Sequence, residues 1–154
     1  MYNLDESMRG GTCCLSKAGL AVGGTASIMR LNDPTGAGYV SFAINGYIYT
    51  IVDADDNVAF TAATQAALTT CLYTVCIAYD GTITVVKGDE VVTANLTAGT
   101  HVLNWPMATA DTCPLGGVRV VATAVFTPGT TDLGTGNAAT YYDFYTVPTE
   151  PMTS

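Results

Sequence analysis

Residues 72–91 read LYTVCIAYDGTITVVKGDEV, and this stretch decides the fold. Two runs rich in β-branched and aromatic residues flank Asp80-Gly81, a dipeptide typical of a tight turn between antiparallel strands. A two-residue turn fixes three cross-strand pairs: Tyr79 with Thr82, Ile77 with Thr84, and Val75 with Val86. Side chains alternate along a strand, so both faces of this hairpin are apolar. Each face therefore needs a cover, either a second layer of the same chain or another subunit.

A second hairpin precedes it at residues 39–52, YVSFAINGYIYTIV. Asn45-Gly46 supplies the two positive φ angles that a type I′ turn requires. The turn predicts three pairs on one face: Ile44 with Tyr47, Phe42 with Tyr49, and Val40 with Ile51. The opposite face, with Ala43 beside Ile48 and Ser41 beside Thr50, is less hydrophobic. We expect the aromatic face to point into the core.

The remaining patterns add short strands and little helix. Strands are expected at residues 26–31, 90–94, 101–105, 118–126 and 140–147. A short helix is expected from Thr61 or Thr64 to Ala67 or Leu68, where small residues follow a capping threonine. Seven or more short strands with frequent turn signals predict an all-β fold, an antiparallel β-sandwich or a jelly-roll-like barrel with at most one short helix.

We expect one β-sandwich domain over residues 38–154, preceded by an extended N-terminal arm over residues 1–37. The arm segment shows no sustained hydrophobic period and contains six glycines, at positions 10, 11, 19, 23, 24 and 36. A chain of 154 residues is long enough to bury a full core.

The composition indicates a surface that is polar but nearly free of charge. Only 12% of the residues are charged, and the net charge is -8. Weak repulsion between copies favours association. The five cations are scattered singly along the chain, at Arg9, Lys17, Arg30, Lys87 and Arg119. Nucleic acid is therefore excluded as a partner, and we expect no membrane partner, because no apolar run approaches the length of a membrane helix. The start of the sequence, MYNLDESMRGG, does not predict a secretory signal, so synthesis in a cytoplasm is expected.

The cysteines do not follow a metal-ligand pattern. Cys13, Cys14, Cys71, Cys76 and Cys113 form one vicinal pair, one pair five positions apart and a singleton, whereas zinc sites need two close pairs. Reduced thiols are expected, with Cys76 filling the core as a small hydrophobe. The acidic stretch at residues 53–57 lacks the glycine and glutamate of a calcium loop, so a solvated turn is expected there. No metal or cofactor is predicted.

No catalytic constellation is visible, so the protein is not expected to be an enzyme. His101 has no orienting partner in the sequence, and nucleophile-elbow, P-loop and dinucleotide patterns are missing. Asp89 and Glu90 are adjacent on an expected strand, so their side chains point to opposite faces and do not flank one bond. Trp105 and the tyrosines fit core or interface packing better than sugar stacking; the tyrosines concerned are Tyr39, Tyr47, Tyr49, Tyr73 and Tyr79.

Four blocks carry a family resemblance: FAINGYIYTI, AYDGTITVVKG, CPLGGVRVVA and FTPGTTDL, in this order. Together they resemble small virion proteins of tailed bacteriophages, namely capsid decoration (cement) proteins and head fibres, over roughly residues 40–145. The resemblance implies a β-rich protein at symmetry points of the outer capsid surface. It also implies a homo-oligomer, often a trimer, that reinforces contacts between major capsid protein subunits. The turn at Pro128 and Gly129 then presents Thr130, Thr131 and Asp132 to a neighbour.

Two further hypotheses accompany this resemblance. Residues 2–31 are expected to lie extended over the capsid subunits while the sandwich projects outward. The alternative function is a phage fibre or adhesin module that binds a host surface glycan. An exposed tyrosine or tryptophan in a shallow groove would distinguish that alternative.

Overall fold

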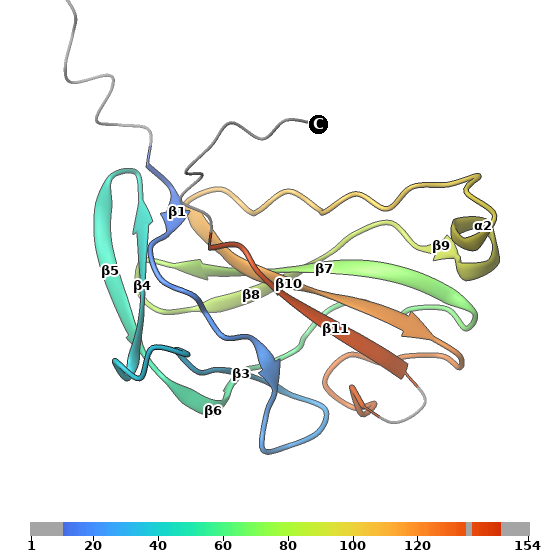
Figure 1. The fold of residues 1–154 in the computed structure, drawn as a ribbon, viewed down its shortest axis with the longest axis horizontal. Coiled ribbons are helices and arrows are strands. Elements are labelled where there is room, and N and C mark those ends of the chain that lie inside the picture. The colour runs from blue at the N-terminus through green and yellow to red at the C-terminus, as the bar shows by residue number, and fades with distance from the viewer. Residues whose placement is uncertain (1–10, 135–136, 146–154) are drawn as a thin grey trace, which may run out of the picture.

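The computed structural model describes residues 11–134 and 137–145, and the fold is all-β with one short helix (Figure 1). The largest sheet has the strand order β11-β10-β7-β8, with β9 also paired to β7. Its strands are β7 (Thr69–Ala78), β8 (Ile83–Lys87), β9 (Val91–Val92), β10 (Thr112–Ala122) and β11 (Asn137–Asp143). All pairings in this sheet are antiparallel.

Two three-stranded sheets complete the fold. The first has the order β1-β4-β5 and the second the order β2-β3-β6. Their strands are β1 (Cys13–Cys14), β2 (Ala21–Val22), β3 (Met29–Leu31), β4 (Tyr39–Ile44), β5 (Tyr47–Val52) and β6 (Ala54–Val58). None of the three sheets closes into a barrel, so the sandwich description holds and the barrel alternative does not.

One continuous core joins the large sheet to the two small ones. Tyr73 and Val75 on β7 share this core with Phe42 on β4, Leu31 on β3 and Val58 on β6. Each of these side chains is at most 1% exposed. The core strand β7 has nine buried residues in succession, as expected for a strand covered on both faces.

The Asn45-Gly46 prediction is confirmed in detail. Both residues have positive φ, 52° and 84°, and β4 pairs with β5 in the predicted register. On β4 the predicted inner face is buried, with Phe42 at 1% exposure. The prediction is wrong for Tyr47, whose ring is 72% exposed, because the turn carries it past the edge of the core.

The register predicted for the Asp80-Gly81 hairpin is wrong by one residue. Ile77 pairs with Ile83 and Val75 with Val85, so the loop has three residues instead of two. The amide of Gly81 donates to the Ala78 carbonyl oxygen at 3.1 Å, and the Ala78 amide donates to Thr82 O at 2.9 Å. Gly81 has φ 85°, as in a type I turn followed by a left-handed residue. The dipeptide Asp-Gly is compatible with both loop lengths, so the sequence alone did not distinguish the three-residue loop from a two-residue turn.

The outer face of the large sheet is covered by the chain's own residues 101–110, here called the covering segment. Thr74 Oγ1 donates to the Pro106 carbonyl oxygen at 3.0 Å. The Trp105 ring lies against Gly117 and packs edge-on against Tyr142 and Phe144, with centroid distances of 5.4 and 5.0 Å. In Figure 1 this segment returns along the sheet from α2 to the start of β10. The strand expected at residues 101–105 is absent, because this stretch lies over the sheet without joining a ladder.

Residues 11–37 are an integral part of the sandwich, in contrast to the expected arm. Cys14 on β1 pairs with Phe42, and β3 pairs with both β2 and β6. Leu20, Met29 and Leu31 are buried in the core. The strands here are two or three residues long, too short to show a period in the sequence. Residues 1–10 of the expected arm lie outside the described residues.

The other sequence expectations are met in part. Residues 26–31, 118–126 and 140–147 correspond to β3, β10 and β11 with shifted ends, and residues 146 and 147 lie outside the described residues. The expected strand at 90–94 is only β9, and α2 (Thr93–Thr97) follows it at once. The helix expected near residues 61–68 does not form, because Gln65 makes a bridge with Phe126. The expected acidic turn is instead β6, paired with β3.

Candidate binding surfaces

The described residues hold no catalytic centre that we recognise. His101 is exposed, and its Nδ1 lies 3.3 Å from its neighbour Thr100 Oγ1. Over residues 11–134 and 137–145, no three histidine, cysteine or acidic residues gather in a way that would hold a metal ion.

Glu90, one of the two carboxylates considered for catalysis, has a structural role. Its Oε1 pairs with Lys87, and its Oε2 accepts the Ala66 amide at 3.0 Å. Burial acts to raise the pKa of Glu90, but these hydrogen bonds lower it below its ordinary value. Lys87 Nζ also donates to Thr64 O at 2.6 Å. The ion pair thus ties the loop before β7 to the end of β8.

The threonine-rich loop at residues 127–133 is exposed at its tip and anchored at its end. Thr130 and Asp132 are exposed, as the resemblance implies. Thr131 is half-buried, and its Oγ1 accepts the Thr127 amide at 3.0 Å. Leu133 is buried, and its amide donates to Ala26 O at 2.9 Å. The loop therefore holds Thr130 and Asp132 exposed in a fixed position.

Large apolar side chains gather around β5, and we call them the β5 surface. They are highly exposed, at 47% to 73%: Tyr39, Tyr47, Ile48, Val52 and Tyr79. β5 itself carries no charged residue. Scattered single apolar residues are normal on a protein surface, and larger exposed apolar groups are candidate interaction sites. Side chains alternate along β5, so Ile48 and Val52 lie on one face of the strand and Tyr47 on the other. In Figure 1 the β4–β5 hairpin stands at one end of the molecule, and the loop between β10 and β11 lies away from it, below the large sheet.

A shallow groove of about 590 Å³ borders the β5 surface. It runs between Thr50–Ala54 and the Tyr79–Gly81 loop. The Tyr79 ring is 68% exposed and leans on Tyr49 with a centroid distance of 6.4 Å. Hydrogen bonds from Thr82 hold the pKa of Asp80 below its ordinary value, so this carboxylate is charged at neutral pH. An exposed aromatic ring beside hydrogen-bond acceptors suits a polyhydroxylated ligand.

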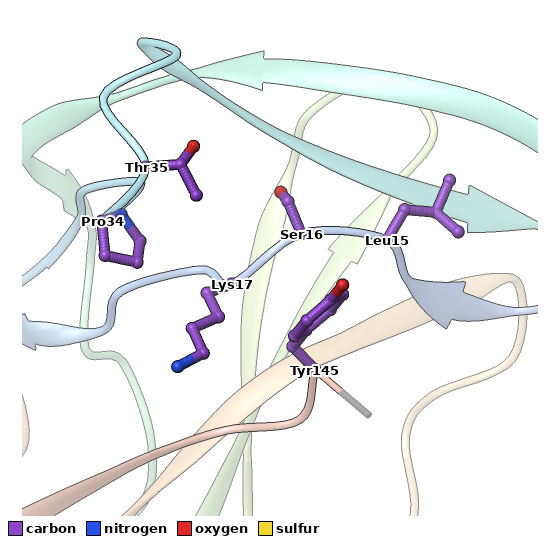
Figure 2. A pocket seen from close by; sticks show the side chains of 6 residues that line it. All are labelled: Leu15, Ser16, Lys17, Pro34, Thr35 and Tyr145. Carbon is purple, nitrogen blue, oxygen red and sulfur yellow. The ribbon is translucent and has the colours of Figure 1, made fainter. Parts of the chain in front are cut away.

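A second hollow, of about 440 Å³, lies where residues 15–17 meet Pro34, Thr35 and Tyr145 (Figure 2). Its hydroxyl groups serve the fold. Ser16 Oγ accepts the Ser41 amide at 2.8 Å, and Thr35 Oγ1 donates to Asp33. Hydrogen bonds from the side chain and the backbone amide of Thr35 lower the pKa of the Asp33 carboxyl. Figure 2 shows the Tyr145 ring and the Lys17 stem on the same side of the chain. The hollow therefore lies at the junction of three chain segments and has no polar group set aside for a ligand among the hydroxyls of Ser16 and Thr35.

The aromatic residues predicted to pack in the core or an interface are partly buried and partly exposed in the structure. Tyr73 is fully buried, as predicted for packing, whereas Trp105 belongs to the covering segment, packs edge-on against Tyr142 and is 37% exposed. Tyr39, Tyr47 and Tyr79 are not core residues. Alternation along the strands could not identify them, because each lies at a strand end or in a turn, where the core stops.

All five cysteines are free thiols, and only Cys13 is exposed. Burial raises the pKa of Cys14 and Cys71 to about 11 and that of Cys113 to about 12. Burial also raises the pKa of Cys76, whose side chain is fully enclosed as expected. The four buried thiols are therefore protonated and unreactive at neutral pH.

Comparison with known proteins gives no relative. The chain matches no family model, no curated protein and no solved structure. Among the described residues, none of the helices has the length and hydropathy to span a bilayer.

Proposed function

We propose that this protein is a structural virion protein, a capsid decoration protein of a tailed phage. It binds the outer surface of the head and reinforces contacts between major capsid protein subunits. The proposal starts from the ordered sequence blocks that resemble this group. Within the described chain, its structural support is the β5 surface, an exposed group of large apolar side chains around a strand without charge.

The exposed loop chemistry fits the same role. Threonine hydroxyls both donate and accept hydrogen bonds without the desolvation cost of a charge. Each such bond adds only about 1 kcal/mol, so stable attachment depends on many contacts and repeated copies. An icosahedral head supplies that repetition. Localisation on the capsid surface, after synthesis in the host cytoplasm, follows from this role.

Two parts of the sequence hypothesis take a narrower form. The hypothesis of an arm over residues 2–31 is withdrawn for residues 13–31, because these supply strands and core side chains, and residues 2–10 lie outside the described residues. Trimer formation remains part of the proposal. The two-sided β7–β8 hairpin no longer supports it, because the covering segment of the same chain lies over that hairpin's outer face. The low charge of the surface is the remaining support.

Co-sedimentation with phage heads that lack the protein tests the proposal. We expect saturable binding at a fixed copy number and heads that retain DNA at higher temperature. Thr130→Glu adds a charge at the exposed loop and should weaken binding, whereas Thr84→Glu, on an exposed site of β8, should bind like the wild type. Absence of binding by the folded wild-type protein would overturn the proposal.

The Tyr79 groove favours a second candidate, glycan binding by a fibre or adhesin module. The exposed tyrosine in a shallow groove is the feature that distinguishes this class. A glycan array probes it directly. We expect a Tyr79→Ala variant to lose any signal that the wild type gives, with Tyr47→Ala, at the exposed turn of the β4–β5 hairpin, as the control. A blank array for the wild type would remove this candidate and leave the capsid proposal untouched.

A further inference from the structure

Strand β5 is a sheet edge without the usual protection. It is the last strand in the order β1-β4-β5, and β4 is its only partner among the described strands. Natural edge strands are blunted by lysine, proline or a bulge, because a bare edge pairs with other chains. The β5 sequence YIYTIV has neither lysine nor proline, and its pairing with β4 runs without a register shift.

The turn geometry defines which backbone groups face outward. In a two-residue hairpin the residues that flank the turn, Ile44 and Tyr47, form a hydrogen-bonded pair, and such pairs recur at every second position. The amides and carbonyls of Ile48, Thr50 and Val52 therefore point away from β4. Ile48 and Val52 also keep more than two thirds of their side chains exposed, and Thr50 is exposed between them.

This edge is complementary to itself. In an antiparallel pair about a two-fold axis through Thr50, each threonine faces its own counterpart, and Ile48 of one copy faces Val52 of the other. All three outward residues then sit in hydrogen-bonded pairs, so every outward amide and carbonyl finds a partner. Apolar side chains meet apolar side chains, and hydroxyl meets hydroxyl. β5 itself carries no charged residue, and the register sets Tyr47 opposite Asp53, the first residue after the strand.

We propose that β5 pairs with β5 of a second copy, centred on Thr50, and joins two three-stranded sheets into one of six strands. A second copy suits this edge because the match between Ile48 and Val52 needs only the sequence that the chain already carries. The contact uses the same patch on both copies, so it closes on itself and does not grow into fibres. The contact uses Ile48 and Val52 of the β5 surface, which also supports the capsid proposal, and it leaves Thr130 and Asp132 of the threonine-rich loop exposed.

Charge substitution at the two-fold axis provides the first test. Thr50→Lys places two like charges opposite one another, which destabilises a strand pair, and Thr50→Glu does the same. We expect light scattering to show half the wild-type mass for either variant alone, and the full mass for an equimolar mixture of the two. Thr84→Lys, at an exposed position of β8, an edge strand of the large sheet, is the matched control and should keep the wild-type mass.

Measurements from micromolar to about 1 mM protein cover weak as well as tight contacts. The proposal is overturned if the wild type and Thr50→Lys have the same mass throughout, or if the mixture fails to restore the wild-type mass. An assembly larger than a dimer still supports the proposal, provided that Thr50→Lys halves it. An odd number of copies that is insensitive to residue 50 contradicts it.

A disulfide trap tests the register independently. Paired residues in antiparallel strands have Cα atoms about 4.5–5.5 Å apart, within the range that a disulfide spans. In a Cys13→Ser background, which removes the exposed native thiol, Thr50→Cys should give covalent dimers under mild oxidation. Thr84→Cys should stay monomeric on a denaturing gel. Equal cross-linking of the two variants would show random collision and reject the register.

Discussion

The Trp105 ring lies so close to Gly117 that the residue at 117 has no room for a side chain. A β-carbon built on Gly117 would lie 2.3 Å from Cζ3 of the indole and 2.7 Å from the Tyr73 carbonyl oxygen. The covering segment thus packs directly against the backbone of Gly117 through the Trp105 ring. The contact explains how a segment without regular secondary structure stays fixed over the large sheet.

Gly117→Ala should therefore destabilise the protein by overpacking. The methyl group meets backbone on one side and the indole on the other, and such insertions cost about 1–3 kcal/mol. Chemical denaturation measures the change, and Trp105 fluorescence should report a more solvated indole. Gly134→Ala is the matched control, because a β-carbon there meets nothing within 4 Å. Equal midpoints for the two variants would contradict this packing.

Tyr73→Phe should destabilise the fold through an unsatisfied amide. The Tyr73 hydroxyl donates to Gln65 Oε1 at 3.0 Å, while Gln65 Nε2 donates to Thr69 O and Val120 O. Loss of the hydroxyl leaves a buried oxygen without its donor, which costs about 1–3 kcal/mol. The exposed control Tyr79→Phe should change the free energy of unfolding by less than about 0.5 kcal/mol. A neutral Tyr73→Phe would mean that Gln65 finds another donor.

Leu31→Ala tests whether the segment expected to be an arm is part of the core. Leu31 is fully buried on β3, and truncation of a buried leucine costs about 2–5 kcal/mol. Val22→Ala on β2 removes a side chain that is 40% exposed and should cost well under that. Urea denaturation of the two variants makes the comparison. An unperturbed Leu31→Ala protein would restore the arm interpretation.

The two hairpins show how far local sequence determines this fold. Asn-Gly specifies a two-residue turn closely enough that the register of β4 and β5 follows from it. Asp80-Gly81 fits two loop lengths, and the side chain of Asp80, which accepts the Thr82 amide at 2.9 Å, stabilises the longer one. A single residue of ambiguity there shifts every cross-strand pair of β7 and β8.

Long-range packing accounts for most other differences. The segment around Gln65 has helical composition, but its amide and carbonyl pair with Phe126, far along the chain. The short strands β1, β2 and β3 are held by partners between about 7 and 30 positions away, so no local period marks them. The β5 surface was visible only as an apolar strand. Its exposure depends on where the core ends.

Stability should fall in alkaline solution because of the buried thiols. Burial raises the pKa of Cys14 and Cys71 to about 11 and of Cys113 to about 12, from an ordinary value of 9.0. The folded state therefore holds these protons more tightly than the unfolded chain. Their contribution is complete below about pH 9 and is lost as the pH rises through the folded values.

Urea midpoints at pH 8, 9, 10 and 11 measure this loss. Cys113→Ala should flatten the decline, since one of the buried thiols no longer titrates, although the variant starts from a lower stability. Cys13→Ser, at the exposed thiol, should leave the profile unchanged. A midpoint that is constant from pH 8 to 11 would contradict burial of the thiols.

Leu68 carries a backbone strain that a substitution can relieve. Its φ is 60°, and the other non-glycine residues with positive φ in the described chain are Asn45 and Asp111, types that tolerate this conformation. The left-handed conformation costs a leucine about 1–2 kcal/mol. The Leu68 side chain is 67% exposed, over a hollow beside Val92, so its burial offsets little of this cost. Leu68→Asn should therefore raise the free energy of unfolding by about 0.5–1 kcal/mol. Leu68→Ala is the control, because it shortens the side chain but keeps the strained conformation. A Leu68→Asn protein no more stable than Leu68→Ala would show that the leucine side chain, and not its backbone angle, determines stability at this position.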